Sequence, residues 1–273
     1  MTTAKALARL SEPKLRAWIL ARMREDHVDP PIAESRLESL DDYVRLVYQE
    51  TDDEKFRAKI EKAALAALGE VAEGDLRAGP DARAARNLAA LVDGLDLDDA
   101  APVLQAIAER GAFGGNEGGL DPAAEEMVLF ALAGLQTPGK LWAKWEALWQ
   151  QKSPRLWPVV TAGLRLSNAK KALGILPEAV RRAASHAEFP LGEVLWAFAT
   201  EEQFDSKDIA PALKGLSPEE RKRCREALSA LGAEQDEIDE WVPIIETASP
   251  ALLPWMCKVP PMPVPRLGAH AWR

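Results

Sequence analysis

The sequence predicts an all-α protein built as a right-handed α-solenoid, in which antiparallel helix pairs stack with a period of about 32 residues. Three observations lead to this prediction. Helix-start signals recur at multiples of sixteen residues, and apolar blocks follow nearly the same spacing. The composition is 47% hydrophobic and rich in Ala and Leu, with none of the alternating β-branched runs that strands need.

The helix-start signals are dipeptides in which a capping side chain precedes proline. Such a side chain accepts bonds from unpaired amides, while proline has no amide to leave unpaired. The separations are 16, 16, 64 and 32 residues, and Ser185 falls on the same spacing within the long gap. Thr200 opens a further capping-box pattern one position away from it. We therefore expect helices to begin within about two residues of Asp121, Thr137, Ser153, Ser185, Ser217 and Ser249.

The first third of the chain, residues 1–110, predicts helices without this regularity. A helix is expected from Ser11 to about Glu25 and another from Ser39 to Gln49. A capping box over 51–54 opens a long helix that ends between Gly69 and Gly74, and two more helices are expected around 83–93 and 98–110. These irregular helices are expected to be degenerate or capping repeats, because end repeats must present a polar outer face.

Residues 111–120 contain five glycines and are expected to form a mobile loop between the N-terminal helices and a regular array over 121–258. A phosphate-binding loop is disfavoured, because no strand precedes the segment and no Gly-Lys-Ser/Thr follows it. Residues 259–273 are proline-rich, so we expect an extended tail there.

Within the array, apolar blocks end at positions 132, 164, 198 and 231, which gives separations of 32, 34 and 33 residues. On these repeats and their caps, residues 121–250 resemble HEAT-like α-solenoid repeats, in which paired antiparallel helices stack side by side. The resemblance concerns architecture and implies a long concave surface that is suited to holding another protein.

Net charge is −9, and its distribution separates the middle of the chain from its ends. Residues 111–200 carry 9 basic and 8 acidic side chains, whereas both flanking parts are acidic. This balance makes nucleic acid an unlikely partner class, because phosphate binding needs a basic surface. There is no apolar run of membrane-spanning length and no secretory h-region near Met1, and two distant cysteines fit a reducing compartment, so we expect a cytoplasmic protein.

The tryptophans of the middle segment are the strongest candidates for function. Trp142, Trp145 and Trp149 follow helical spacing, with basic residues interspersed. One interpretation is a docking surface for a protein partner, for which an acidic partner is expected. The other assigns Trp145 and Trp149, with Leu141 and Leu148, to the core. The residues expected to bind the partner are Trp142, Lys144, Arg155, Arg165 and Lys171.

Catalytic patterns are weak. His27, His186 and His270 have no metal-ligand spacing, so no metal or other cofactor is expected, and no catalytic residue is assigned. Cys224 lies among arginines and lysine, on what we interpret as a solvated basic helix face. We expect a non-enzymatic scaffold or adaptor of undetermined oligomeric state. Two alternatives stay open: a structural subunit of a larger assembly, and an alkylpurine DNA glycosylase with HEAT-like repeats, whose Trp and carboxylate are similar in kind to the tryptophans near Glu146.

Overall fold

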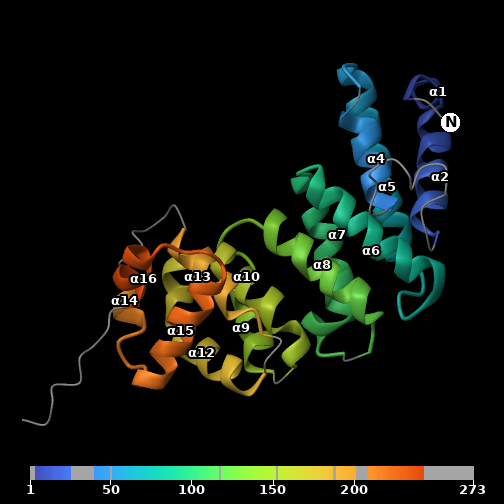
Figure 1. The fold of residues 1–273 in the computed structure, drawn as a ribbon. Helices are drawn as coiled ribbons and strands as arrows, with labels where there is room; N and C mark the ends of the chain where they lie inside the picture. The colour runs from blue at the N-terminus through green and yellow to red at the C-terminus, as the bar shows by residue number, and fades with distance from the viewer. Residues whose placement is uncertain are drawn as a thin grey trace, which may run out of the picture.

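The computed structural model describes residues 4–25, 40–49, 51–116, 118–151, 153–186, 189–200 and 208–242. Every regular element within these ranges is a helix, as the sequence predicts. The helices form an elongated body in which neighbours in the chain are neighbours in space, from α1 and α2 at one end to α15 and α16 at the other (Figure 1). The expected tail over 259–273, together with Ser249 and the pattern at 200–203 beyond its first residue, lies outside the described residues.

Up to residue 72, the described ranges contain four α-helices. Asp53 caps the longest of them, since its side chain accepts bonds from the backbone amides of Lys55 (3.0 Å) and Phe56 (3.3 Å). The cap is thus Asp53 and not Thr51 as expected, and Thr51 instead accepts a bond from the Asp53 amide. These helices are α1 (Ala4–Ala8), α2 (Glu12–Met23), α4 (Leu40–Gln49) and α5 (Glu54–Ala72).

The middle of the chain alternates α-helices with short 3-10 turns. Arg110, at the end of α7, donates from its guanidinium to the carbonyl groups of Ala72 and Gly74 and so ties this helix to the end of α5. The elements are α6 (Gly79–Gly94), η1 (Asp98–Ala100), α7 (Ala101–Arg110), η2 (Ala112–Gly114) and α8 (Pro122–Leu135).

Shorter helices follow α8. The elements are α9 (Trp142–Gln150), η3 (Pro154–Leu156), α10 (Trp157–Ser167), α11 (Ala169–Ala172), η4 (Leu173–Ile175), α12 (Leu176–Ser185), α13 (Leu191–Ala199), α14 (Ile209–Ala212), α15 (Pro218–Ala230) and α16 (Gln235–Trp241).

Three of the expected helix starts are found. Asp121 caps α8 by accepting bonds from the amides of Ala123 and Ala124, both at 3.1 Å. Ser217 and Glu220 form a reciprocal capping box at the start of α15. Ser153 precedes a 3-10 turn that leads into α10, but its side chain makes no capping bond.

Two expected starts are wrong. Thr137 opens a β-turn, in which the Lys140 amide donates to the Thr137 carbonyl and Gly139 adopts a φ of +80°, so that α9 begins only at Trp142. Ser185 is the last residue of α12 and bonds back to the Arg182 carbonyl. A capping residue before proline is thus compatible with a turn as well as with a helix start.

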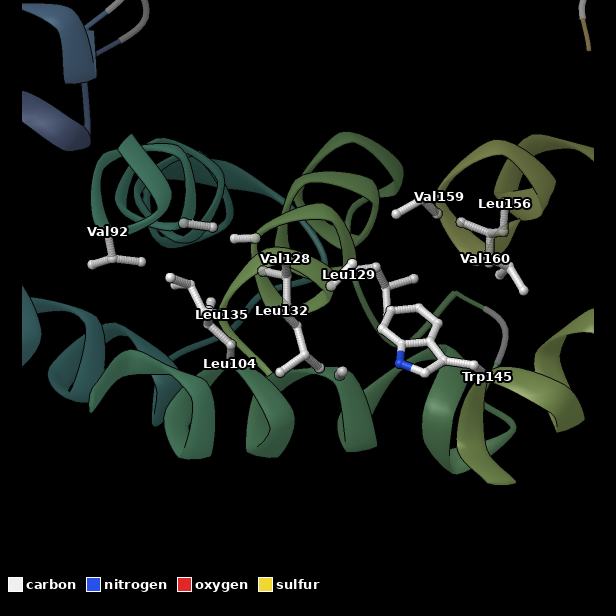
Figure 2. Packing of buried hydrophobic residues seen from close by; sticks show 14 of the residues in the cluster. Val92, Leu104, Val128, Leu129, Leu132, Leu135, Trp145, Leu156, Val159 and Val160 are labelled. Atoms are coloured by element: carbon white, nitrogen blue, oxygen red, sulfur yellow. The ribbon is translucent and has the colours of Figure 1, made fainter. Parts of the chain in front are cut away.

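The core runs along the body and is built mainly by α6, α8 and α10. These helices pack against one another in chain order, while α7 and α9 contact α8 and α10. Figure 2 shows side chains of α8, including Val128 and Leu132, lying between those of α6 and α7 on one side and Trp145 and Val160 on the other. Because α8 contributes to both sides, it joins the N-terminal helices to the rest of the body.

Trp145 is completely buried and carries a polar group that is fully bonded. Its indole N–H donates to the Gln136 side-chain oxygen at 2.8 Å, and the Gln136 amide nitrogen donates to the carbonyl groups of Ala133 and Gly163, both at 3.1 Å. Gly163 lies directly against the indole, because a Cβ at this position would be 2.4 Å from the ring. The packing therefore requires glycine here.

The glycine-rich segment packs against the body on both sides of Glu117, which is outside the described residues. Phe113 is buried, and its ring meets that of Trp145 edge to face at a centroid distance of 4.9 Å. A Cβ on Gly114 would lie 2.0 Å from the Glu109 carbonyl oxygen, and one on Gly119 would lie 2.2 Å from that of Arg110. Glycine thus permits close backbone packing here, and whether the segment is also mobile stays a prediction.

Candidate functional site

The five residues predicted to bind a partner do not form one surface. Trp142 and Lys171 meet, since the Lys171 ammonium lies 4.1 Å from the centroid of the Trp142 ring. Lys144, Arg155 and Arg165 lie at three other places: against α7, at the start of α8, and in a hollow between α8, α10 and α13. The interpretation of Trp145 and Trp149 as core residues is correct, because both are buried.

Lys144 holds α9 against the preceding part of the chain. Its ammonium donates to a Glu109 carboxylate oxygen at 3.0 Å and to the Phe113 carbonyl at 3.3 Å. Glu109 belongs to α7 and Phe113 to η2, so this side chain links three elements. Lys144 therefore has internal acceptors, and its contribution to the structure does not depend on a partner.

Arg155 has a similar structural role at the start of α8. Its guanidinium donates to the Pro122 carbonyl at 2.8 Å and to the Glu125 carboxylate at 2.6 Å. Glu125 is buried and also accepts a bond from the Ala112 amide at 2.8 Å. This carboxylate thus holds the glycine-rich segment and η3 against the same helix end.

A stacked arginine that was not predicted from the sequence organises the aromatic residues. The Arg182 guanidinium lies 3.7 Å from the Trp149 ring centroid and 4.6 Å from that of Trp157. It also donates to the Trp149 carbonyl at 2.8 Å and to Glu178 at 3.2 Å. The i,i+4 pair of Glu178 and Arg182 was visible in the sequence, but no local pattern shows which aromatic rings the arginine will meet.

Beside this arginine, a cavity of about 470 Å³ opens between α9 and α12. Trp142, Trp149, Glu146, Glu178 and Arg182 line it. The indole N–H of Trp142 is buried and has no acceptor among the described residues. The cavity therefore combines aromatic faces already covered by cations with two exposed carboxylates.

A second cavity, of about 280 Å³, is mostly apolar and lies between α8, α10 and α13. We call it the α8–α10–α13 groove. Phe130 on its α8 wall is 51% exposed, which is unusual for a phenylalanine in a folded body. Arg165 lines it, and so do the carboxylates Glu126 and Glu193. The remaining lining includes Pro158, Val159, Ala162, Pro190, Val194, Ala197 and Phe198.

The groove continues into two neighbouring hollows. One, of about 680 Å³, shares Glu126 and Pro158 with it and adds Arg155, Ser185 and His186. The other, of about 320 Å³, shares Pro190 and Glu193 and ends at Leu231, which is 43% exposed. Three hollows that share lining residues thus lie along α8, α10, α13 and α15.

Two of the nucleophilic or metal-binding candidates, Cys224 and His186, fall within the described ranges. Cys224 is buried, and burial raises the pKa of its thiol to about 12, so the expected position on a solvated face is wrong for this residue. His186 packs edge to face on Trp157 at a centroid distance of 4.8 Å. Within the described ranges, no three His, Cys, Asp or Glu residues are grouped as metal ligands. His27 and His270 lie outside these ranges.

Comparison of the chain with models of known protein families, with curated proteins and with solved structures gives no match. Over the part of the chain that the structure covers, no helix combines the length and apolar character needed to cross a bilayer. We therefore infer the function from the geometry of these surfaces.

Proposed function

We propose that this protein is a non-enzymatic scaffold or adaptor, in which an α-solenoid of stacked helix pairs holds a partner protein. The order of helix contacts supports the solenoid: α8, α10, α13 and α15 pack in series, with α9 against α10 and α12 against α13. Their starts at residues 122, 157, 191 and 218 are separated by 35, 34 and 27 residues, which is close to the expected period.

The observation that carries the proposal is the α8–α10–α13 groove. An exposed phenylalanine above an apolar floor, with charged groups at the rim, has the composition of a protein interface: an apolar centre surrounded by polar residues. Leu166 extends the apolar surface along α10, because it lies one helical turn from Ala162 and is 36% exposed. The docking element is an apolar segment with a basic side chain that pairs with Glu126 or Glu193.

The groove is a better docking site than the predicted set of tryptophan and basic residues. Lys144 and Arg155 already donate to Glu109 and Glu125, so an acidic partner would have to compete with these internal bonds. Lys171 is exposed and lies above the Trp142 ring. We therefore assign an acidic partner to Lys171 only if Lys171→Glu, and not Phe130→Asp, lowers the affinity for the partner.

The test uses two matched variants of the full chain. Phe130→Asp places a charge in the groove, and Lys171→Glu reverses the charge above Trp142; both positions are exposed helix sites, so the fold should be retained. A partner identified by co-purification is then titrated against each purified variant. Loss of affinity with Phe130→Asp alone supports the groove, and unchanged affinity with that variant contradicts it.

A second function is favoured by the cavity between α9 and α12, where Trp142, Glu146 and Trp149 come together. This arrangement is similar in kind to a glycosylase site for alkylated bases. The acidic balance of the chain and the cations already stacked on both rings weigh against it. Release of an alkylated base from DNA, lost in Glu146→Gln, would establish the enzyme and remove the scaffold as the main function.

A further inference from the structure

The α8–α10–α13 groove has a lining that favours proline-rich ligands. Phe130 supplies an exposed aromatic ring above a floor that includes the buried Phe198, and Pro158 and Pro190 supply rigid apolar edges. Segments in the polyproline II conformation dock in aromatic-lined grooves, because they lose little conformational entropy on binding. The lining therefore selects for such a segment over a flexible apolar chain.

The chain itself contains a matching sequence. It continues for 31 residues after Val242, and residues 259–267 read Val-Pro-Pro-Met-Pro-Val-Pro-Arg-Leu. A polyproline II helix has three residues per turn. Pro261, Val264 and Leu267 would therefore share one apolar edge, while Arg266 ends the adjacent edge.

Charge favours contact between this segment and the body. Residues 243–273 carry Lys258, Arg266 and Arg273 against Glu246, a formal charge of +2, so the rest of the chain carries −11. At the groove itself, the carboxylates of Glu126 and Glu193 outnumber the single cation, Arg165. We thus expect residues 243–273 to be attracted to the rest of the chain by its net charge, and to the groove by the carboxylates at its rim.

The segment also has the reach that docking requires. The last described residues lie beside α13, a wall of the groove, since the Trp241 and Trp196 ring centroids are 5.6 Å apart. Sixteen residues, 243–258, lie between Val242 and Val259, and this linker spans at most about 60 Å when extended. Nine residues of polyproline II cover about 28 Å, whereas three adjacent helix axes span about 20 Å.

We propose that residues 259–267 of this chain dock in cis along the α8–α10–α13 groove, with Arg266 beside the rim carboxylates Glu126 and Glu193. The inference rests on the proposed function, because the segment occupies the surface assigned to the partner. It acts as an internal competitor: a partner must displace it to bind. The partner's apparent affinity is then reduced by the fraction of molecules in which the segment is docked.

Photo-crosslinking of the full chain tests the proposal directly. A benzophenone side chain is placed at Phe130, or in a second variant at Ala197, which also lines the groove. Irradiation should join the probe to residues 259–267 within one chain, detected on the tryptic peptide Val259–Arg266. Arg266→Glu should remove this product, which in that variant is sought on the tryptic peptide Val259–Arg273. The control probe at Ala106, an exposed position on α7 that lines none of the cavities described, should give no such product.

Three results would overturn the inference: no product with residues 259–267 from either groove probe, an equal yield from the Ala106 control, or a product that joins two copies of the chain. The proposed function fails separately. If the segment crosslinks but Phe130→Asp leaves partner affinity unchanged, the groove is internal to the chain and the scaffold proposal is wrong. If Phe130→Asp lowers the partner affinity but residues 259–267 do not crosslink to the groove, only the assignment of this segment to the groove is wrong.

Discussion

Replacing Gly163 with Ala tests the packing around Trp145, the largest completely buried side chain. A Cβ at residue 163 would come within 2.5 Å of three atoms of the Trp145 indole. The ring cannot move without cost, because it is buried and its N–H is bonded to Gln136. Gln136 in turn donates to the Gly163 carbonyl, so the added methyl group disturbs a closed network.

The expected change in the free energy of unfolding combines one stabilising and two destabilising contributions. Alanine improves helix propensity over glycine by about 1 kcal/mol. Overpacking a filled core costs about 1–3 kcal/mol, and weakening the bond between Trp145 and Gln136 costs about 1 kcal/mol more. We expect a net loss of about 2 kcal/mol in the free energy of unfolding, or a decrease of about 4–8 °C in Tm for a chain of this size.

Urea unfolding, followed by circular dichroism and by tryptophan fluorescence, measures this loss. The matched control is Gly69→Ala in α5, where a Cβ would meet nothing within 4 Å. This control should stabilise the protein by about 0.4–1 kcal/mol. If Gly163→Ala stabilises the protein as the control does, the inference that residue 163 packs directly against the Trp145 indole is wrong.

Three further predictions follow from contacts described above. Asp121→Ala and Ser217→Ala should each lower the free energy of unfolding by about 1 kcal/mol, whereas Ser153→Ala should change it by only a few tenths, and equal effects in thermal unfolding would contradict the assigned caps. Glu125→Ala should cost about 2–3 kcal/mol because it leaves two donors without their acceptor, and a neutral result in urea unfolding would disprove this role. In the Cys257→Ser variant, which leaves Cys224 as the single thiol, Cys224 should react with an aromatic disulfide at pH 8 only after denaturation. Its pKa is raised from 9.0 to about 12 by burial, so its contribution to stability is complete below pH 9 and is lost as pH rises toward 12; rapid labelling of the folded chain would contradict the burial.

The helical class and the main core tryptophans were predictable because they depend on local patterns. Apolar residues at helical spacing place Trp145 and Trp149 on the buried face of α9, and Asp121 and Ser217 cap helices as their side chains predict. The predicted helix start at Thr137 was wrong because Thr-Pro-Gly also fits a β-turn, in which Gly139 takes a positive φ. A capping side chain precedes proline at Thr137, as it does at Asp121 and Ser217. The residues that follow the proline decide whether a turn or a helix forms.

The candidate site was less predictable, because its contacts join distant parts of the chain. Lys144 meets Glu109, 35 residues earlier, and Arg155 meets Glu125, 30 residues earlier. Phe130 lies in an apolar run on α8 whose other members are buried, so composition could not show that this one faces outward. Exposure in a helix that is apolar on all sides is set by its neighbours.

The serial packing of α8, α10, α13 and α15 has a mechanical consequence. In such a stack, each helix transmits force mainly to the next, so a load on the ends is shared as small tilts between neighbours. A groove between consecutive helices widens or narrows as the stack bends. We therefore expect the opening above Phe130 to change when the stack of α8, α10, α13 and α15 bends.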